Sequence, residues 1–364
     1  MREIGIGVIG CGGAAWIGHL PWYKMNPNVK LVAVADVNEK RARAARDYFH
    51  VDYYYTDYEK LLSRNDIDAV SICTPVHLHA VQTVVALENS KHVLVEKPMA
   101  RDIIECNHMI KASEKHDRIL MVGFMKRFNP AFKYIKEVLA RGELGIPYYC
   151  DVHWTLFDIR GSEGFRYKAY TGGGVFQDHG SHYIDLIRWW LTDEVIEVSA
   201  EFNIMVKGRE VEDHGVVLLR FRRGAIATIE TSRVGPNHPQ YCLWERGQVY
   251  CTRGCVLFDA PDWTSYELPL VKVFNGSEWI VKHFFKKGRY PPNHYMFKLE
   301  IDHFVDCVMS GRKPLVTGED GKVVVEVVNA AYLSQLRCER VKLPLDRISI
   351  KDINFDDFPR FYVD

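Results

Sequence analysis

The first 125 residues alternate between short apolar runs and stretches with the spacing of helices. Helical stretches lie near residues 14–25, 38–49, 57–63, 77–89 and 101–116. The apolar runs, typical of buried strands, are 4–10, 30–36, 68–74, 91–96 and 118–123. Strands that alternate with helices predict a parallel, doubly wound sheet, in which ligands bind at the carboxyl ends of the strands.

The rest of the chain has longer strand patterns. A helix is expected at 130–145, and closing amphipathic helices at 293–311 and 319–336. Strands are expected at 146–157, 195–206, 216–221 and 225–232. Because residues 215–221, GVVLLRF, are nearly all apolar, both faces of their sheet should be covered. Helices can cover one face and a second copy of the protein the other, which predicts a homo-oligomer, a dimer or a tetramer.

Length and composition bound the function. With 364 residues we expect two domains, residues 1–125 and 126–364. Lys plus Arg and Asp plus Glu both number 47, so the charge favours neither nucleic acid nor a membrane as partner but a small neutral ligand. Nine scattered cysteines and the absence of a signal-peptide pattern predict a cytoplasmic protein without a disulfide framework. Cys251 and Cys255 supply too few ligands for structural zinc.

A glycine motif follows the first apolar run. GCGGAA, residues 10–15, fits G-x-G-x-x-[GA], in which glycines make a tight turn and admit a pyrophosphate at a helix N-terminus. Asp36 ends the second strand about 20 residues later, where a carboxylate accepts hydrogen bonds from a ribose diol. Because that carboxylate would repel a 2′-phosphate, and Val37 and Asn38 offer no guanidinium, we predict NAD in preference to NADP. The alternative role of Asp36, as a helix N-cap, is compatible with this one.

Other strand ends carry polar motifs at the same predicted edge, Thr74-Pro75 and Glu96-Lys97-Pro98. A lysine after a buried strand is often a surface residue. Here, however, the Lys97 ammonium would lie beside the nicotinamide, where it could stabilise an alkoxide that forms as hydride leaves. The predicted cofactor-binding residues are Gly10, Cys11, Gly12, Gly13, Ala14, Ala15, Asp36, Thr74, Pro75, His79, Glu96 and Lys97.

Residues 172–190, GGGVFQDHGSHYIDLIRWW, gather acids and imidazoles at the start of an expected helix. The three glycines permit unusual backbone angles and a close approach to a cofactor. Positions four apart on a helix are about 40° apart in projection, so Asp178 and His182 share a face, whereas His179 is rotated by about 100° from Asp178. A divalent metal on Asp178, His179 and His182 is the rival interpretation; it would leave the nucleotide motifs without a purpose.

Six motifs in this order resemble the Gfo/Idh/MocA family, named for glucose-fructose oxidoreductase and inositol dehydrogenase. They are GVIGCGGAA, VADVNEKRA, ICTPVHLHA, HVLVEKPMA, GFMKRFNPAF and GGGVFQDHGSHYIDL. The resemblance implies an α/β protein, with an N-terminal Rossmann domain and a C-terminal α/β domain that has a large, mostly antiparallel sheet. It also implies a catalytic group of Lys97, Asp178 and His182, and places Arg127 near the pocket, although a structural ion pair is an equal alternative for Arg127.

Chemistry assigns roles to these residues. The imidazole of His182, with an ordinary pKa near ~6.5, suits a base that removes a hydroxyl proton. Asp178 would orient it or bind substrate, Lys97 would bind the hydroxyl and relay a proton, and Asp185 would be structural. The predicted substrate-binding residues are Lys97, Arg127, Asp178 and His182.

The predicted function is an NAD-dependent oxidoreductase that acts on a secondary hydroxyl of a sugar, a cyclitol such as myo-inositol, or a related polyol. The alternatives are an enzyme with tightly bound NAD and a redox-neutral reaction, of the glycosidase or epimerase type, and a non-catalytic NAD-sensing regulator. Residues 259–292 and the C-terminal tail match no motif. Residues that could contact the substrate, if they do not simply pack, are Trp154, Phe157, Phe165, Tyr167, Tyr170, His294 and Tyr295.

Overall fold

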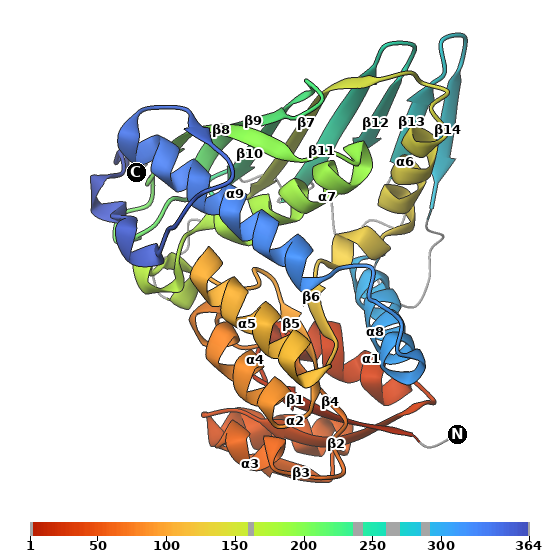
Figure 1. The fold of residues 1–364 in the computed structure, drawn as a ribbon, viewed down its shortest axis with the longest axis vertical. Coiled ribbons are helices and arrows are strands. Elements are labelled where there is room, and N and C mark those ends of the chain that lie inside the picture. The colour runs from red at the N-terminus through yellow and green to blue at the C-terminus, as the bar shows by residue number, and fades with distance from the viewer. Residues whose placement is uncertain (1–2, 159–163, 236–242, 260–269, 285–291, 363–364) are drawn as a thin grey trace. The chain divides into compact units, whose positions relative to one another are not determined.

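The computed structural model describes residues 3–158, 164–235, 243–259, 270–284 and 292–362. The chain forms two compact units (Figure 1). The first unit consists of Met1–Met125 and His294–Val323, and the second of Lys126–Asn293 and Val324–Asp364. A division at residue 125 alone therefore omits the return of residues 294–323 to the first unit.

The first unit contains a six-stranded sheet in the order β3-β2-β1-β4-β5-β6, and every pair in it is parallel. Its strands are β1 (Ile4–Ile9), β2 (Val29–Ala35), β3 (Tyr53–Tyr55), β4 (Ala69–Ile72), β5 (His92–Glu96) and β6 (Leu120–Gly123). This order is that of the dinucleotide-binding doubly wound fold, with the topological switch between β1 and β4. The predicted fold of this unit is confirmed.

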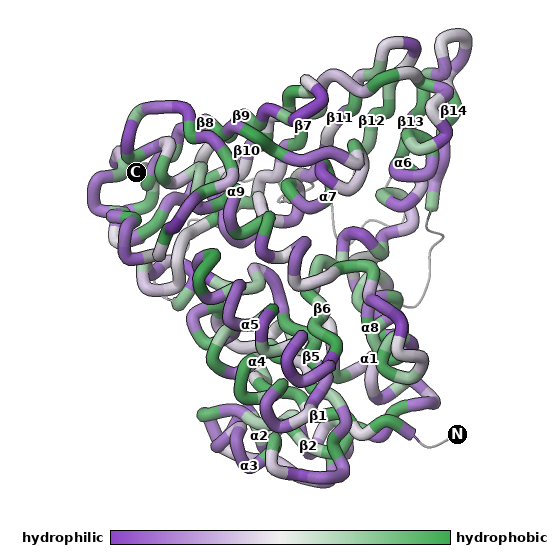
Figure 2. The backbone as a smooth tube through the Cα atoms, viewed as in Figure 1, coloured by the Kyte–Doolittle hydropathy of each residue, from purple (hydrophilic) through white to green (hydrophobic). Residues whose placement is uncertain are grey.

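Helices follow the strands as the pattern predicted. They are η1 (Ala15–His19), α1 (Leu20–Met25), α2 (Glu39–Phe49), α3 (Tyr58–Leu62), η2 (Val76–Leu78), α4 (His79–Glu88), α5 (Ile103–His116), α8 (Pro292–Ser310) and the start of α9 (Gly318–Arg337). Side chains cap three of them: Asn38, Asp57 and Asp102 each accept a backbone N–H from the first turn of the helix that follows. Along α8 and α9 hydrophobic and hydrophilic segments alternate in Figure 2, as amphipathic helices require.

The second unit contains a nine-stranded sheet in the order β14-β13-β12-β11-β7-β10-β9-β8-β15. Only β7 and β10 pair in parallel, so the predicted mostly antiparallel sheet is confirmed for the described residues. The strands are β7 (Pro147–Leu156), β8 (Val195–Asn203), β9 (His214–Phe221), β10 (Ile226–Ser232), β11 (Leu243–Cys251), β12 (Cys255–Asp259), β13 (Leu270–Phe274), β14 (Trp279–His283) and β15 (Val341–Lys342).

Helices of the second unit cover one face of this sheet (Figure 1). These are α6 (Pro130–Ala140), α7 (Ser181–Leu191) and most of α9. The short helices in this part of the chain are η3 (Met125–Phe128), η4 (Phe165–Tyr167), η5 (Ala169–Thr171), η6 (Phe176–Gly180), η7 (Ile350–Asp352) and η8 (Phe355–Asp357). On β9, Val217 and Leu219 are fully buried, whereas Val216 and Leu218 are 43% and 37% exposed. Within this chain the apolar run of β9 is therefore covered on one face and open on the other, and the cover of the open face by a second copy of the protein stays a prediction.

The two unassigned segments take part in the second unit. Strands β13 and β14 come from residues 259–292 and extend the sheet at one edge, while residues 260–269 and 285–291 lie outside the described residues. In the tail, Phe355 and Phe358 pack on Tyr332 of α9. The eight described cysteines are free thiols. Among the described helices, none is both long and apolar enough to cross a membrane.

Candidate active site

The glycine motif forms a tight turn between β1 and η1. Gly10 has φ +92°, and a Cβ at this position would lie 2.8 Å from the backbone of Cys73. At Gly12 and Gly13 an added Cβ would meet no described atom within 4 Å. The turn therefore needs glycine at position 10 for its own geometry, whereas positions 12 and 13 leave an open cradle that fits the close approach of a pyrophosphate.

Asp36 is tied to this turn. Its Oδ2 accepts the backbone N–H of Cys11 at 2.8 Å, and its Oδ1 accepts the N–H of Asn38 at 2.8 Å. Burial, and next the charge of Asp36, raise the pKa of the Cys11 thiol to about 12, so this thiol stays protonated at neutral pH. Asp36 thus fixes the glycine turn and lies at the edge predicted for a ribose, whereas the N-cap of α2 is Asn38 and not Asp36.

His79 ties together two strand-end turns. The ring is buried; its Nδ1 lies 2.9 Å from the carbonyl of Pro98 and its Nε2 lies 2.8 Å from the carbonyl of Thr74. Burial lowers the pKa of His79. The structure therefore places this predicted cofactor residue between the turns, where it connects Thr74 to the segment that carries Lys97.

Lys97 follows β5, and its backbone N–H connects to a buried polar network through Glu96. The N–H of Lys97 donates to Glu96 Oε2 at 3.2 Å, and Glu96 Oε1 lies 2.9 Å from His19 Nε2. His19 Nδ1 lies 3.0 Å from Ser71 Oγ, which lies 2.7 Å from the hydroxyl of Tyr23. Burial works against a charged Glu96, yet the hydrogen bond with His19 and the nearby charges leave the pKa of Glu96 below its usual value. A carboxylate is thus maintained at the residue before Lys97, where it accepts the backbone N–H of the lysine.

Sequence reasoning missed His19, Ser71 and Tyr23, although one signal was present. A histidine lies four residues beyond the glycine motif, in the first helical turns. That segment, Ala15–His19, is a π-helix, and π-helical turns occur often at functional sites.

The acidic and imidazole cluster of the second unit also begins with a π-helical turn, η6, before α7. The expected helix is present, but its first turn has i→i+5 bonding in place of the assumed α-helical phase. His182 is buried, at 3% exposure. His179 Nε2 lies 3.4 Å from Asp178 Oδ2, and its ring stacks on Trp154 with centroids 3.4 Å apart and planes at 12°.

An arginine that the sequence did not point to holds Asp178. Arg233, just after β10, donates from Nη2 to Asp178 Oδ2 at 2.5 Å, and Arg166 Nε lies 3.4 Å from the same oxygen. The side chain of Arg233 is only 8% exposed, whereas that of Arg166 is 53% exposed. Two guanidinium groups at one oxygen favour the charged form of Asp178.

Arg127, predicted to bind substrate, lies in a buried ion pair with Asp185. Arg127 Nε donates to Asp185 Oδ2 at 2.8 Å and Nη2 to Oδ1 at 2.7 Å, and the two side chains are 5% and 1% exposed. This bidentate geometry favours the structural alternative for Arg127 and agrees with the structural role expected of Asp185.

The glycines 172–174 form a turn whose backbone angles require glycine. Gly172 and Gly173 have φ +96° and +150°, which side chains rarely adopt. The close approach that requires glycine is to other residues of the same unit: a Cβ on Gly173 would lie 2.2 Å from the hydroxyl of Tyr332, and one on Gly174 would lie 2.0 Å from the carbonyl of Glu212. The conformational freedom expected of these glycines is therefore used.

The remaining candidate residues are spread over both units. Trp154 and Tyr167 are buried, Phe165 and Tyr170 are exposed, and Phe157 is intermediate. His294 and Tyr295 belong to the first unit. In the described part of the chain, His, Cys, Asp and Glu side chains form no group of three or more that could hold a metal ion. Lys97 belongs to the first unit and Asp178 and His182 to the second, so their approach to one another stays a prediction.

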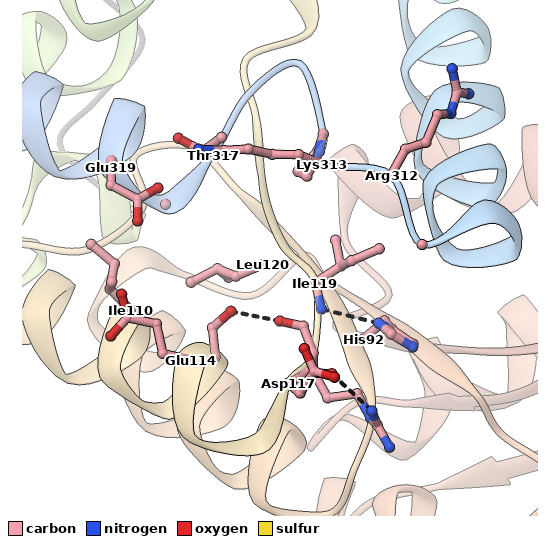
Figure 3. A pocket seen from close by; sticks show the side chains of 15 residues that line it. His92, Ile110, Glu114, Asp117, Ile119, Leu120, Arg312, Lys313, Thr317 and Glu319 are labelled. Atoms are coloured by element: carbon pink, nitrogen blue, oxygen red, sulfur yellow. Dashed lines mark hydrogen bonds between the residues drawn. The ribbon is translucent and has the colours of Figure 1, made fainter.

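A surface hollow of about 470 Å³ lies elsewhere in the first unit (Figure 3). It is lined by His92 at the start of β5, by Ile119 and Leu120 at the start of β6, and by Thr317, Gly318 and Glu319 at the start of α9. These are the amino ends of the strands, the edge opposite to Gly10 and Lys97. The hollow is therefore distinct from the predicted nucleotide edge.

Comparison with known proteins finds a family model for each of the two units. Residues 4–124 match the family model described as "Oxidoreductase family, NAD-binding Rossmann fold", and residues 132–257 match the "GFO/IDH/MocA C-terminal domain". A myo-inositol 2-dehydrogenase of Thermotoga maritima is 32% identical over 93% of this chain and 98% of its own length. The uncharacterized oxidoreductase YrbE of Bacillus subtilis is 31% identical over 92% and 94%. Levoglucosan dehydrogenase, solved with NADH and levoglucosan, has a TM-score of 0.84 at 21% identity and covers 94% of this chain and 100% of that one.

Proposed function

The chain belongs to the Gfo/Idh/MocA family of oxidoreductases, and from that premise we propose that it transfers hydride between NAD and a secondary hydroxyl of a sugar, a cyclitol such as myo-inositol, or a related polyol. The names of relatives, among them a myo-inositol 2-dehydrogenase and a scyllo-inositol 2-dehydrogenase, support this substrate class. The single observation that carries the proposal is the common strand-end edge of Gly10, Asp36 and Lys97 in a parallel sheet of dinucleotide-binding order.

The open positions at Gly12 and Gly13 and the carboxylate of Asp36 fit a dinucleotide. The glycine turn and the start of η1 would receive the pyrophosphate, and Asp36 would accept hydrogen bonds from the ribose diol. We propose NAD over NADP because a 2′-phosphate would face the Asp36 carboxylate. NAD, when bound, supplies the acceptor for the hydride.

The chain itself handles the proton and the developing charge. The Lys97 ammonium would donate a hydrogen bond to the hydroxyl oxygen and stabilise the alkoxide. His182 would take the hydroxyl proton as general base. Asp178, held by Arg233, would bind a neighbouring hydroxyl or stabilise the protonated imidazole. Lys97 and His182 would need to meet at one substrate for this chemistry.

A panel of sugars, cyclitols and sugar acids, assayed by NADH absorbance, tests the proposal. His182→Ala should lower turnover of the best substrate by about 10² to 10⁴-fold, and Lys97→Ala by about 10² to 10³-fold. The matched controls are His108→Ala and Lys111→Ala, which replace exposed residues of α5 and should leave turnover unchanged. Full turnover in either active-site variant would refute the assigned role.

Two further outcomes separate the alternatives. Tightly held NAD without net NADH release would indicate a redox-neutral reaction, and NAD binding without turnover of any substrate would indicate a regulator. Calorimetric titration with NAD and NADP tests the role of Asp36, because much tighter binding of NADP would contradict it.

We also propose a homo-oligomer. The open face of the second sheet carries Val216 and Leu218 of β9, both exposed in the single chain, and covering them would bury apolar surface. Light scattering coupled to gel filtration distinguishes a dimer or a tetramer from a monomer. A replacement of both residues by Ser should shift the population toward the monomer.

A further inference from the structure

The glycine turn that leads to Asp178 and His182 is held from within the second unit by one carboxylate. Glu212, two residues before β9, accepts the N–H of Gly174 at 2.9 Å on Oε2 and at 3.1 Å on Oε1. Its Oε1 also accepts the N–H of Phe176 at 3.0 Å and the hydroxyl of Tyr332 at 2.8 Å. The backbone carbonyl of Glu212 accepts the N–H of Val175 at 3.1 Å.

These contacts lie where the backbone has little freedom to move. Phe176 is the first residue of η6, where backbone N–H groups have no partner inside the helix and need an outside acceptor. The Cβ positions of Gly173 and Gly174 are already occupied by Tyr332 and Glu212. The turn is thus clamped both by steric contact with Tyr332 and Glu212 and by hydrogen bonds to the carboxylate of Glu212.

This clamp depends on the charge of Glu212. A carboxylate only accepts hydrogen bonds, which suits the three groups that donate to it here. A proton on Oε2 would face the N–H of Gly174, which would then lose its shorter hydrogen bond and keep only the longer one to Oε1, at 3.1 Å. Protonation should therefore loosen the glycine turn.

The buried environment of Glu212 brings the pKa of its carboxyl group to about neutral pH. Complete burial raises the pKa of Glu212 to about 7, against the hydrogen bonds from Tyr332, Phe176 and Gly174. The titratable group of α9 that faces Glu212 is Tyr332, while η6 and the glycine turn present backbone N–H groups. The neighbouring carboxylate, Asp213, binds the N–H groups of Met205 and Val206 and lies 3.3 Å from Arg209.

We propose that Glu212 is a positioning residue of the active site, whose charged carboxylate holds the glycine turn and the first turn of η6 and thereby sets the places of Asp178 and His182. The inference rests on the proposed roles of Asp178 and His182. It predicts that turnover rises with pH as Glu212 loses its proton, and that the hydroxyl of Tyr332 adjusts the pH at which this happens.

The first test follows the clamp directly by NMR. In the full chain, the side-chain carboxyl carbon of Glu212, assigned by its loss in Glu212→Gln, should titrate near pH 7. The amide signals of Gly174 and Phe176 should move with the same midpoint. In Tyr332→Phe the loss of one hydrogen bond to a charged group should raise the midpoint by about 1 to 2 pH units. Tyr149→Phe, whose hydroxyl lies 3.1 Å from Thr228 Oγ1 on β10, is the control and should leave it unchanged.

The second test is the pH profile of NAD reduction with myo-inositol, or with the fastest substrate of the panel if that is another polyol. The acid limb of kcat should move upward by the same interval in Tyr332→Phe. In Glu212→Gln, kcat should fall by about tenfold or more, and the dissociation constant of NAD should stay unchanged because NAD binds the first unit.

Separate results overturn the two proposals. Amides of Gly174 and Phe176 that do not follow Glu212, or an acid limb that Tyr332→Phe leaves in place, would overturn the positioning role. If Glu212→Gln does not fold, Tyr332→Phe alone decides. Full turnover in His182→Ala would instead overturn the proposed function, whatever Glu212 does.

Discussion

Variants of the Arg127–Asp185 pair can distinguish a structural role of Arg127 from a substrate-binding role. In Asp185→Asn an amide replaces the carboxylate that receives two charge-assisted hydrogen bonds, at 2.7 and 2.8 Å, from a guanidinium that is only 5% exposed. Removing one partner of a buried pair costs about 3 to 5 kcal/mol, because the remaining charge stays buried. For a unit of roughly 200 residues each kcal/mol shifts Tm by about 2 to 4 °C. Tm should therefore fall by about 6 °C or more.

The double variant and a surface pair complete the experiment. In Arg127→Met/Asp185→Leu both charges are gone, and the stability should return to within about 2 kcal/mol of the parent protein. The control is Glu339→Gln, which breaks the pair with Arg337 of α9; because the two side chains are 60% and 55% exposed, about 1 kcal/mol or less should be lost. Thermal unfolding and substrate KM are measured on each variant. An Asp185→Asn protein with unchanged Tm and a raised KM would refute the structural role.

Four other replacements test the described contacts. Gly12→Ala should keep Tm but weaken NAD binding more than about tenfold, as measured by calorimetry, whereas Gly174→Ala should lower Tm, since its Cβ would overlap a backbone carbonyl. His19→Ala should lower the free energy of unfolding by about 1.5 to 3 kcal/mol at pH 7. Because the folded pKa of Glu96 lies below its unfolded value, this loss of stability should shrink as pH falls below about 4.5. A loss that does not depend on pH would contradict the role of the His19–Glu96 contact. Hydrogen bonds to two carboxylates raise the pKa of His153 to about 9. The stability that the protonated imidazole contributes is therefore present below about pH 6.5 and lost as pH rises through 9. Between pH 7 and 10, Tm of the parent protein should fall more than Tm of His153→Gln.

Much of the first unit followed from local pattern. Five of the six strands of its sheet are short apolar runs, whereas the edge strand β3, Tyr53–Tyr55, is not such a run and was not predicted. A parallel sheet brings the carboxyl ends of its strands to one edge by construction. The positions of Gly10, Asp36 and Lys97 at that edge could therefore be predicted without coordinates. The continuous apolar run of β9 predicted a sheet covered on both faces. The chain itself covers Val217 and Leu219, while Val216 and Leu218 are exposed and form part of the face proposed for a second copy.

The partners of the candidate catalytic residues could not be predicted in this way. The helical spacing of Asp178 and His182 was visible, but the π-helical turn that carries Asp178 has no distinct composition. Arg233, Glu212 and Tyr332 lie in segments without a recognisable motif. An arginine after a strand or a buried glutamate has many possible roles until its contacts are known.

The amino-acid sequence by itself determined the family, the alternation of strands and helices in residues 1–125 apart from β3, and the strand ends at which the chemistry of the first unit gathers, because these depend on periodicity and on short motifs. The tertiary structure decided which charges are held by which partners. Glu96 meets His19 across 77 residues, Asp178 meets Arg233 across 55, and Glu212 meets Tyr332 across 120. Such contacts form only when distant segments pack, and burial then sets the electrostatic environment that no local pattern encodes.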